Sequence, residues 1–228
     1  MADLDFTPRS FELLEELAAN NEKAWYEKHR DEFQACLRKP FATVLELATD
    51  QLAETSVPFV GGAKTMFRQH RDIRFAKDKS PYSTHVSGLL TPSGIKAEKE
   101  GVVYVQLDCS GGLIACGYYQ LKAAELGPIR DRLLAKPAQF SQVLQDLKNA
   151  GLALTEDDKL TAMPRGYGQY EDHKHADFLK LKSFIVKVEL GRGAWLAGDI
   201  VDCIAEYAKN CASLLEFGRA AKAEEVLR

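Results

Sequence analysis

Residues 102–119, VVYVQLDCSGGLIACGYY, carry the clearest β pattern of the chain. Apolar and polar side chains alternate through its first half, which is typical of a strand with one buried face. The apolar side consists of Val103, Val105 and Leu107, and the opposite side of Tyr104 and Gln106. The turn sequence CSGG at 109–112 then leads into a second apolar run. The pattern predicts an antiparallel β-hairpin.

Helical patterns lie on both sides of this hairpin. Apolar stripes predict three helices within the first 54 residues, beginning at Pro8 behind an N-capping Thr7, at Asn21 and at Pro40. Further helices are expected from Gly127–Pro128, from Pro137, near 174–181 and over 199–216.

Short apolar runs at 65–69, 86–90 and 184–190 predict additional strands. The strands cluster between helical blocks without βαβ alternation. The sequence therefore predicts an α+β fold, with a mainly antiparallel sheet of about four to five strands flanked by N-terminal and C-terminal helices. One domain over 1–228 is expected, in which the helical segment 7–54 packs on a core of sheet and helices over 65–216.

Bulk composition excludes several classes of protein. The chain has 228 residues, a net charge of −3 and 46% hydrophobic residues, which is typical of a globular domain and argues against bulk binding to nucleic acid or anionic membranes. The N-terminus lacks the apolar core of a signal peptide, and no run reaches the roughly 18 apolar residues of a membrane span. Five cysteines without a C-x-x-C pair indicate free thiols, so we expect a cytoplasmic protein.

Residues 67–85, FRQHRDIRFAKDKSPYSTH, form a segment called here the basic segment. Between Lys64 and Lys79 the chain carries six cations and two anions, a net charge of +4, so the remainder of the chain carries −7. On a helix Arg68, Arg71, Arg74 and Lys77 would share a face, whereas on a strand Arg68, His70, Asp72 and Arg74 would do so. Either geometry gathers guanidinium groups, whose forked donors suit phosphate or carboxylate.

A second polar stretch, Pro164-Arg165-Gly166-Tyr167, combines an arginine with a glycine turn that can cradle an oxyanion. We expect Arg165 to lie close to the basic segment and to share its ligand. The alternative is an ordinary loop elsewhere on the molecule. The predicted ligand-binding residues are Arg68, Arg71, Asp72, Arg74, Lys77, Asp78, Lys79, Tyr82, His85, Arg165 and Tyr167.

Three stretches of the chain resemble the domain of unknown function family 2461. They are the central Arg71-Asp72-Ile73-Arg74-Phe75-Ala76-Lys77-Asp78-Lys79-Ser80-Pro81-Tyr82, the early Asn21, Trp25-Tyr26 and His29-Arg30, and the late Pro164-Arg165-Gly166-Tyr167 with Leu179-Lys180-Leu181-Lys182-Ser183-Phe184. The chain departs from the family pattern at Tyr26, where phenylalanine is usual, at Ala76 in place of serine, and at Ser83, where lysine often stands. The resemblance implies one intact domain and supplies no catalytic residue.

The sequence supports a protein that binds an anionic small molecule, with or without a reaction. Two alternatives stay open. The basic segment could be only a salt-bridged structural loop. The protein could also be a nucleic-acid-binding module, but the negative charge of the rest of the chain makes nucleic acid a less favoured partner. No motif names a catalytic residue or a cofactor. His173 and His175 have no distant third ligand, so no metal site is predicted, and the oligomeric state is not predicted either.

Overall fold

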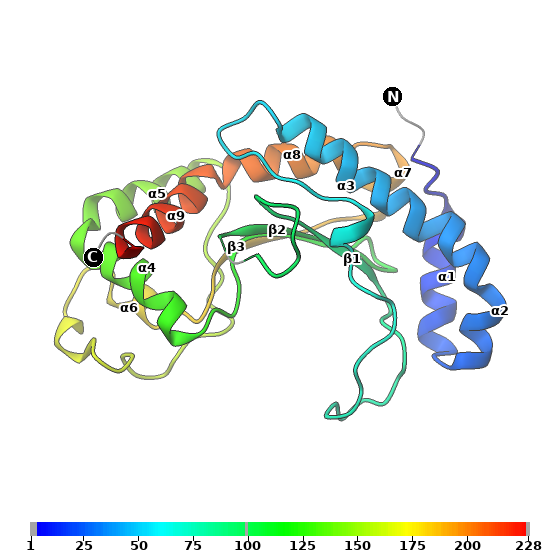
Figure 1. The fold of residues 1–228 in the computed structure, drawn as a ribbon, viewed down its shortest axis with the longest axis horizontal. Helices are drawn as coiled ribbons and strands as arrows, with labels where there is room; N and C mark the ends of the chain where they lie inside the picture. The colour runs from blue at the N-terminus through cyan, green and yellow to red at the C-terminus, as the bar shows by residue number, and fades with distance from the viewer. Residues whose placement is uncertain (1–3, 99, 227–228) are drawn as a thin grey trace. The chain divides into compact units, whose positions relative to one another are not determined.

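A four-stranded antiparallel sheet, in the order β1-β2-β3-β4, confirms the α+β class (Figure 1). The computed structural model describes residues 4–98 and 100–226. Its strands are β1 (Val86–Leu90), β2 (Val102–Leu107), β3 (Leu113–Tyr118) and β4 (Phe184–Glu189). The predicted strand at 65–69 is wrong: this stretch makes only a single bridge, between Met66 and Gly88, because a 3₁₀ turn over Ala63–Thr65 precedes it.

The β2–β3 hairpin forms as the alternation predicts. Val103, Val105 and Leu107 are buried on one face, and the glycines at 111 and 112 make the turn with φ of +127° and +103°. A Cβ on Gly112 would lie 2.0 Å from the carbonyl oxygen of Gln106. Only glycine therefore fits this tight return of the chain.

The N-terminal helices are α1 (Pro8–Ala19), α2 (Lys23–Phe33) and α3 (Lys39–Leu52). Thr7 occupies the N-cap position of α1 as predicted, but Glu22 occupies that of α2 without a capping side-chain bond, and the side chain of Asn21 is engaged in a tertiary contact. A π-helical turn over Gln34–Arg38 joins α2 to α3, and Pro40 lies in the first turn of α3, as predicted. Proline lacks the N–H group that would continue a regular ladder, and the wider turn accommodates this loss.

The later helices are α4 (Ala123–Ala135), α5 (Pro137–Asn149), α6 (Ala176–Leu179), α7 (Arg192–Leu196), α8 (Ile200–Asn210) and α9 (Ala212–Val226). The predicted start of α4 at Gly127–Pro128 is wrong: Glu125 bonds back to the N–H of Lys122 and begins the helix there. The single predicted helix over 199–216 is two helices, because the N–H of Cys211 turns to the carbonyl of Ala208. No helix in the described residues is long and apolar enough to cross a membrane.

The chain divides into two compact units. The first consists of Met1–Glu98, Val103–Ile114 and Val188–Tyr207, and the second of Lys99–Val102, Ala115–Lys187 and Ala208–Arg228. The expectation of a single domain stays a prediction.

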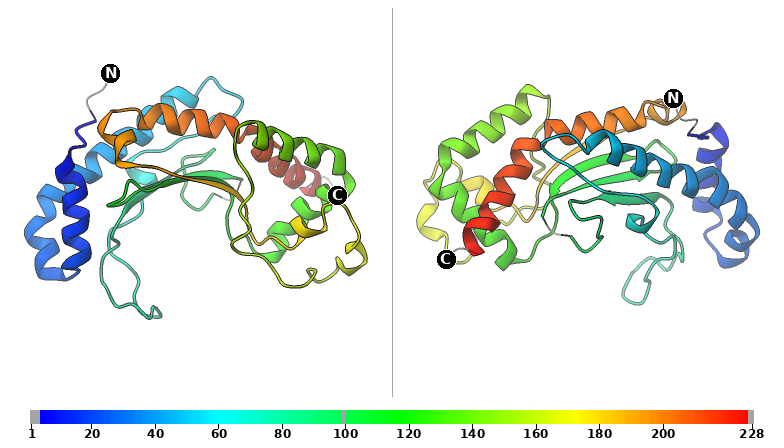
Figure 2. Two further views of the ribbon diagram at one scale, coloured as in Figure 1. Left: turned by 180° about the vertical axis from the view of Figure 1, so that it is seen from behind. Right: turned by 45° about the horizontal axis from the view of Figure 1, so that its top comes forward.

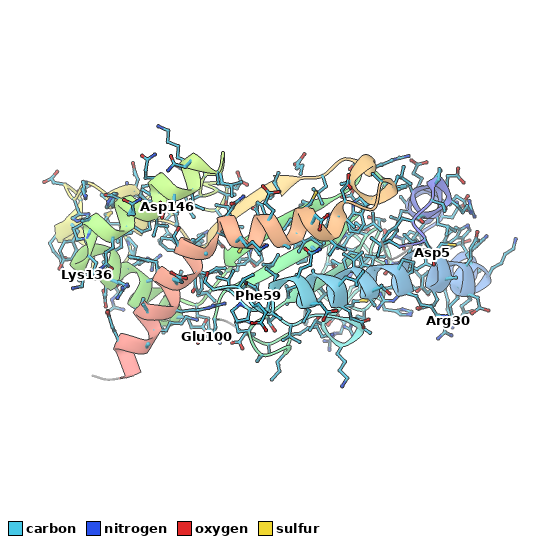
Figure 3. The ribbon with its side chains drawn as sticks, turned by 90° about the horizontal axis from the view of Figure 1, so that it is seen from above. Asp5, Arg30, Phe59, Glu100, Lys136 and Asp146 are labelled. Atoms are coloured by element: carbon cyan, nitrogen blue, oxygen red, sulfur yellow. The ribbon has the colours of Figure 1, made fainter. Side chains whose placement is uncertain are left out.

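In the first unit, α3 and the part of α8 up to Tyr207 cover one face of the strands, as the views in Figures 1, 2 and 3 agree. A Cβ on Gly88 of β1 would lie 2.7 Å from Leu45 of α3, so helix and strand are in close contact there. Trp195 of α7 closes the same core, with its ring centroid 5.9 Å from Phe41 and 5.1 Å from Phe6. The opposite face of the strands is free of these helices, and the basic segment projects on that side (Figure 1).

In the second unit, α9 packs against α4 and α5. Phe140 of α5 is fully buried and contacts the rings of Phe178, Phe184 and Phe217. Tyr118 at the end of β3 donates a hydrogen bond to the carbonyl of Leu215 in α9. This unit therefore has an aromatic core of its own.

Candidate functional site

The basic segment is neither a helix nor a regular strand, but a folded-back loop with a paired stem. The stem starts where Phe67 N–H bonds to the carbonyl of Ser87, and it continues with a bridge between His70 and Tyr82 and a bond from Arg71 N–H to the carbonyl of Pro81. Residues 72–80 form the tip. Both geometries considered for the arginines are therefore wrong, because turns interrupt any regular period.

Asn21, just before α2, anchors the stem to the helices. Its side-chain carbonyl accepts the N–H of Tyr82 at 3.0 Å, and its amide donates to the carbonyl of Tyr82 at 2.9 Å. The Tyr82 side chain is only 2% exposed and stacks on Tyr26 with ring centroids 4.1 Å apart. The early and central motifs of the sequence thus meet in one contact, and the Tyr82 ring belongs to this packing.

Two further side chains stabilise the stem through hydrogen bonds to its backbone. Gln69 is buried, and its amide donates to the carbonyls of Ser83 and His85. Arg38, from the π-helical turn, donates to the carbonyl of Phe67 at 3.1 Å, and burial lowers its pKa. These bonds satisfy backbone groups that the irregular pairing leaves without a ladder partner.

A pocket of about 280 Å³ lies between the stem and the face of β1 and β2 that is opposite α3. β1 and β2 pair with Ser87 opposite Gln106 and Leu89 opposite Tyr104, so these residues share one face. The pocket is lined by Phe67, Arg68, Arg71, Ser83, His85, Ser87 and Tyr104. It therefore combines two guanidinium groups, two serine hydroxyls and one imidazole with the rings of a phenylalanine and a tyrosine.

The two pocket arginines differ in how they are held. Arg71 donates from its Nη1 atom to Asp78 at 2.5 Å and to the carbonyl of Ser80 at 3.0 Å. Within the described part of the chain, Arg68 makes no side-chain hydrogen bond or ion pair. Arg71 is thus fixed in place by one nitrogen, whereas Arg68 is exposed, acts on the charge of Asp72 only at a distance, and can turn its donors to a ligand.

His85 lies in the pocket wall between opposite charges. Burial lowers its pKa below the ordinary 6.5, while Asp108 acts to raise it and Arg71 to lower it. Burial raises the pKa of Asp108, but hydrogen bonds from Ser110, Gln106 and Gly111 outweigh this, and the net shift is downward. The site therefore holds a neutral imidazole near an ionised carboxylate at pH 7.

The tip of the basic segment is organised by its own bonds. Asp72 accepts two side-chain bonds and one backbone bond from Arg74, and Lys79 donates to the carbonyl of Ile73. The side-chain hydroxyl and N–H of Ser80, together with Arg71, hold the pKa of Asp78 well below its usual range. The Phe75 ring, 94% exposed, stands out from the tip with the Arg74 guanidinium carbon 5.9 Å from its centroid.

Among the predicted site residues, the structure brings Arg68, Arg71 and His85 together in the pocket. Asp72, Arg74, Lys77, Asp78 and Lys79 lie on the exposed tip instead. Sequence reasoning missed the remaining wall residues Phe67, Ser83, Ser87 and Tyr104. The alternating pattern over 102–107 placed Tyr104 on the polar side of its strand. The pairing of this strand with β1, which brings Tyr104 to the pocket, could not be predicted from the local pattern.

Arg165 and Tyr167 lie in the second unit, whereas the basic segment lies in the first. Arg165 is exposed, and Gly166 has a φ of +88°. The Tyr167 hydroxyl donates to Asp131 at 2.7 Å, and the guanidinium carbon of Arg130 lies 5.9 Å from its ring centroid. These partners belong to the second unit, and a shared ligand with the basic segment stays a prediction.

A family model described as a conserved hypothetical protein, the domain of unknown function 2461, matches residues 9–217. The chain therefore belongs to this family, as the resemblance of its motifs predicted. No curated protein and no solved structure matches the chain.

Proposed function

We propose that this member of the domain of unknown function 2461 family binds a small molecule carrying an oxyanion, a phosphate or a carboxylate, in the pocket between the stem and the sheet. The observation that carries the proposal is Arg68, a pocket residue without a bonded partner among the described residues. Guanidinium forks recognise planar or tetrahedral oxyanions through paired hydrogen bonds. The odd number of cysteines is typical of free thiols, so we also propose that the protein works in a reducing compartment, the cytoplasm.

The pocket also supplies groups that a purely structural loop does not need. Asp72 and Arg74 of the tip pair with each other, as expected for structural ion pairs, whereas Arg68, like Lys77 of the tip, makes no such bond among the described residues. Ser83 and Ser87 add hydroxyl groups beside it. Calorimetric titration with inorganic phosphate at pH 8 tests the proposal: we expect one site per chain with a dissociation constant of roughly 1 mM or below. Absence of heat at 20-fold higher phosphate, about 20 mM, contradicts it.

Ser83→Lys should strengthen anion binding. The substitution places an ammonium in the pocket wall, and the bonds that Ser83 makes to Gln69 use only its backbone. We expect sulfate affinity to rise roughly 3- to 10-fold at low salt, as for one added hydrogen bond of ordinary net strength, because ordering the long lysine side chain offsets part of the gain from its charge. Thr84→Lys adds the same charge at an exposed neighbour outside the pocket wall and is the control. Equal gains in the two variants would mean that bulk charge alone attracts the anion.

Sulfate affinity should rise as the pH falls from 7.5 to 5.5. His85 has a lowered pKa, so it is neutral at pH 7 and takes up a proton below pH 6.5, and a bound anion stabilises the protonated form. Sulfate is a suitable probe because it does not titrate in this range. Calorimetry at several pH values measures how the sulfate affinity changes with pH, and His85→Gln should remove this pH dependence. A wild-type affinity that is flat over this range speaks against contact between His85 and the anion.

A nucleic-acid module is the second candidate, favoured by one observation. Phe75 is almost fully exposed beside Arg74, a combination on which a base can stack. Fluorescence anisotropy with a labelled 20-mer of deoxythymidine tests it. Binding that weakens steeply with salt and is lost in Phe75→Ala supports this candidate, whereas binding that survives the substitution excludes a role for the exposed ring.

A further inference from the structure

We infer that the ligand of the pocket is a phosphate monoester of a small aromatic group, an inference that rests on the proposed function. It follows from two features of the wall: the number of hydrogen-bond donors around Arg68 and Arg71, and the aromatic pair Phe67 and Tyr104 beside them.

The donor set fits a phosphate better than a carboxylate. A single anion can meet one edge of the Arg68 guanidinium, with two N–H groups, and Arg71, held through Nη1, keeps the edge formed by Nε and Nη2. The hydroxyls of Ser83 and Ser87 add two more donors. A phosphate monoester presents three terminal oxygens and a charge of about −1.5 to −2, whereas a carboxylate presents two oxygens and one charge. The phosphate can therefore accept more of these hydrogen bonds than the carboxylate can.

The aromatic pair indicates the rest of the ligand. The rings of Phe67 and Tyr104 lie 6.2 Å apart at 54°, and Phe67 is 41% exposed although it adjoins the arginines. A large apolar side chain left open in a polar pocket wall offers a flat surface on which a ligand ring can stack. The volume of about 280 Å³ is at the lower end of small-molecule sites, so it suits one ring with its phosphate and little more.

Calorimetry with four probes at pH 8 tests the inference: phenyl phosphate, glycerol 3-phosphate, inorganic phosphate and benzoate. We expect phenyl phosphate to bind about 10-fold more tightly than glycerol 3-phosphate, as stacking on an aromatic side chain provides. Benzoate should bind at least about 10-fold more weakly than phenyl phosphate, since it meets fewer of the donors. Phe67→Leu, which keeps an apolar side chain without the ring, should abolish the preference for phenyl phosphate and leave inorganic phosphate unchanged.

Phe75→Ala is the matched control, because it removes an exposed ring from the same loop outside the pocket wall, and it should change none of the four affinities. Equal binding of phenyl phosphate and glycerol 3-phosphate overturns the aromatic part of the inference, and equal binding of benzoate and phenyl phosphate overturns the phosphate part. In both cases the proposed oxyanion site stands. Failure of all four probes to bind contradicts the proposed function itself.

Discussion

Arg68→Ala is expected to weaken the binding of inorganic phosphate by about 10- to 150-fold, the range that corresponds to losing a hydrogen bond of a charged pair. Arg68 lines the pocket and has no bonded partner among the residues that the structure describes. Because its side chain stabilises no neighbour by such a bond, the free energy of unfolding should change by less than about 0.5 kcal/mol. Calorimetry and urea denaturation measure the two quantities.

Arg74→Ala is the control for this prediction. Arg74 belongs to the same sequence motif, but its side chain is 77% exposed and pairs with Asp72 on the tip. Exposed pairs of this kind contribute little to stability, so both the phosphate affinity and the unfolding midpoint should stay close to wild type. An equal loss of affinity in Arg68→Ala and Arg74→Ala would show that the net charge of the segment matters rather than the pocket.

Asn21→Ala is expected to lower the free energy of unfolding of the first unit by about 2–4 kcal/mol, since it leaves two buried backbone groups of Tyr82 without a partner. Both tryptophans, Trp25 and Trp195, lie in the first unit, so their fluorescence in urea reports on this unit. We also expect weaker phosphate binding, although Asn21 lines no part of the pocket, because the stem loses its anchor to the helices.

Asn20→Ala provides the comparison. Asn20 is exposed, and among the described residues its side-chain amide bonds only to the carbonyl of Glu16 near the end of α1. Its loss should lower the free energy of unfolding by no more than about 1 kcal/mol. Similar unfolding midpoints for Asn20→Ala and Asn21→Ala would contradict the anchoring role of Asn21.

Local patterns predicted the elements that local physics controls. The alternation of Val103, Val105 and Leu107 placed β2 correctly, and Thr7 with Pro8 placed the start of α1. One error arose because a residue serves a distant contact. Asn21 was read as a helix cap, but its side chain is taken by Tyr82, which lies 61 residues later. No local pattern carries such information.

In the candidate site, too, some features could be predicted from the local sequence and others are set by tertiary structure. The charge excess of the basic segment pointed to Arg68, Arg71 and His85, which do lie together. The pairing of Arg74 with Asp72 depends on turns that the sequence pattern did not specify. Tyr104 and Ser87 enter the pocket through the pairing of β1 with β2, which is set by tertiary structure.

A crystal structure of the protein with phosphate tests the anion pocket most directly. We expect one phosphate in the pocket, with its oxygens about 2.7–3.1 Å from guanidinium nitrogens of both Arg68 and Arg71 and a further bond from a wall hydroxyl. A phosphate bound only at the exposed tip, or a pocket in which Arg68 turns away from a bound anion, would contradict the proposed function.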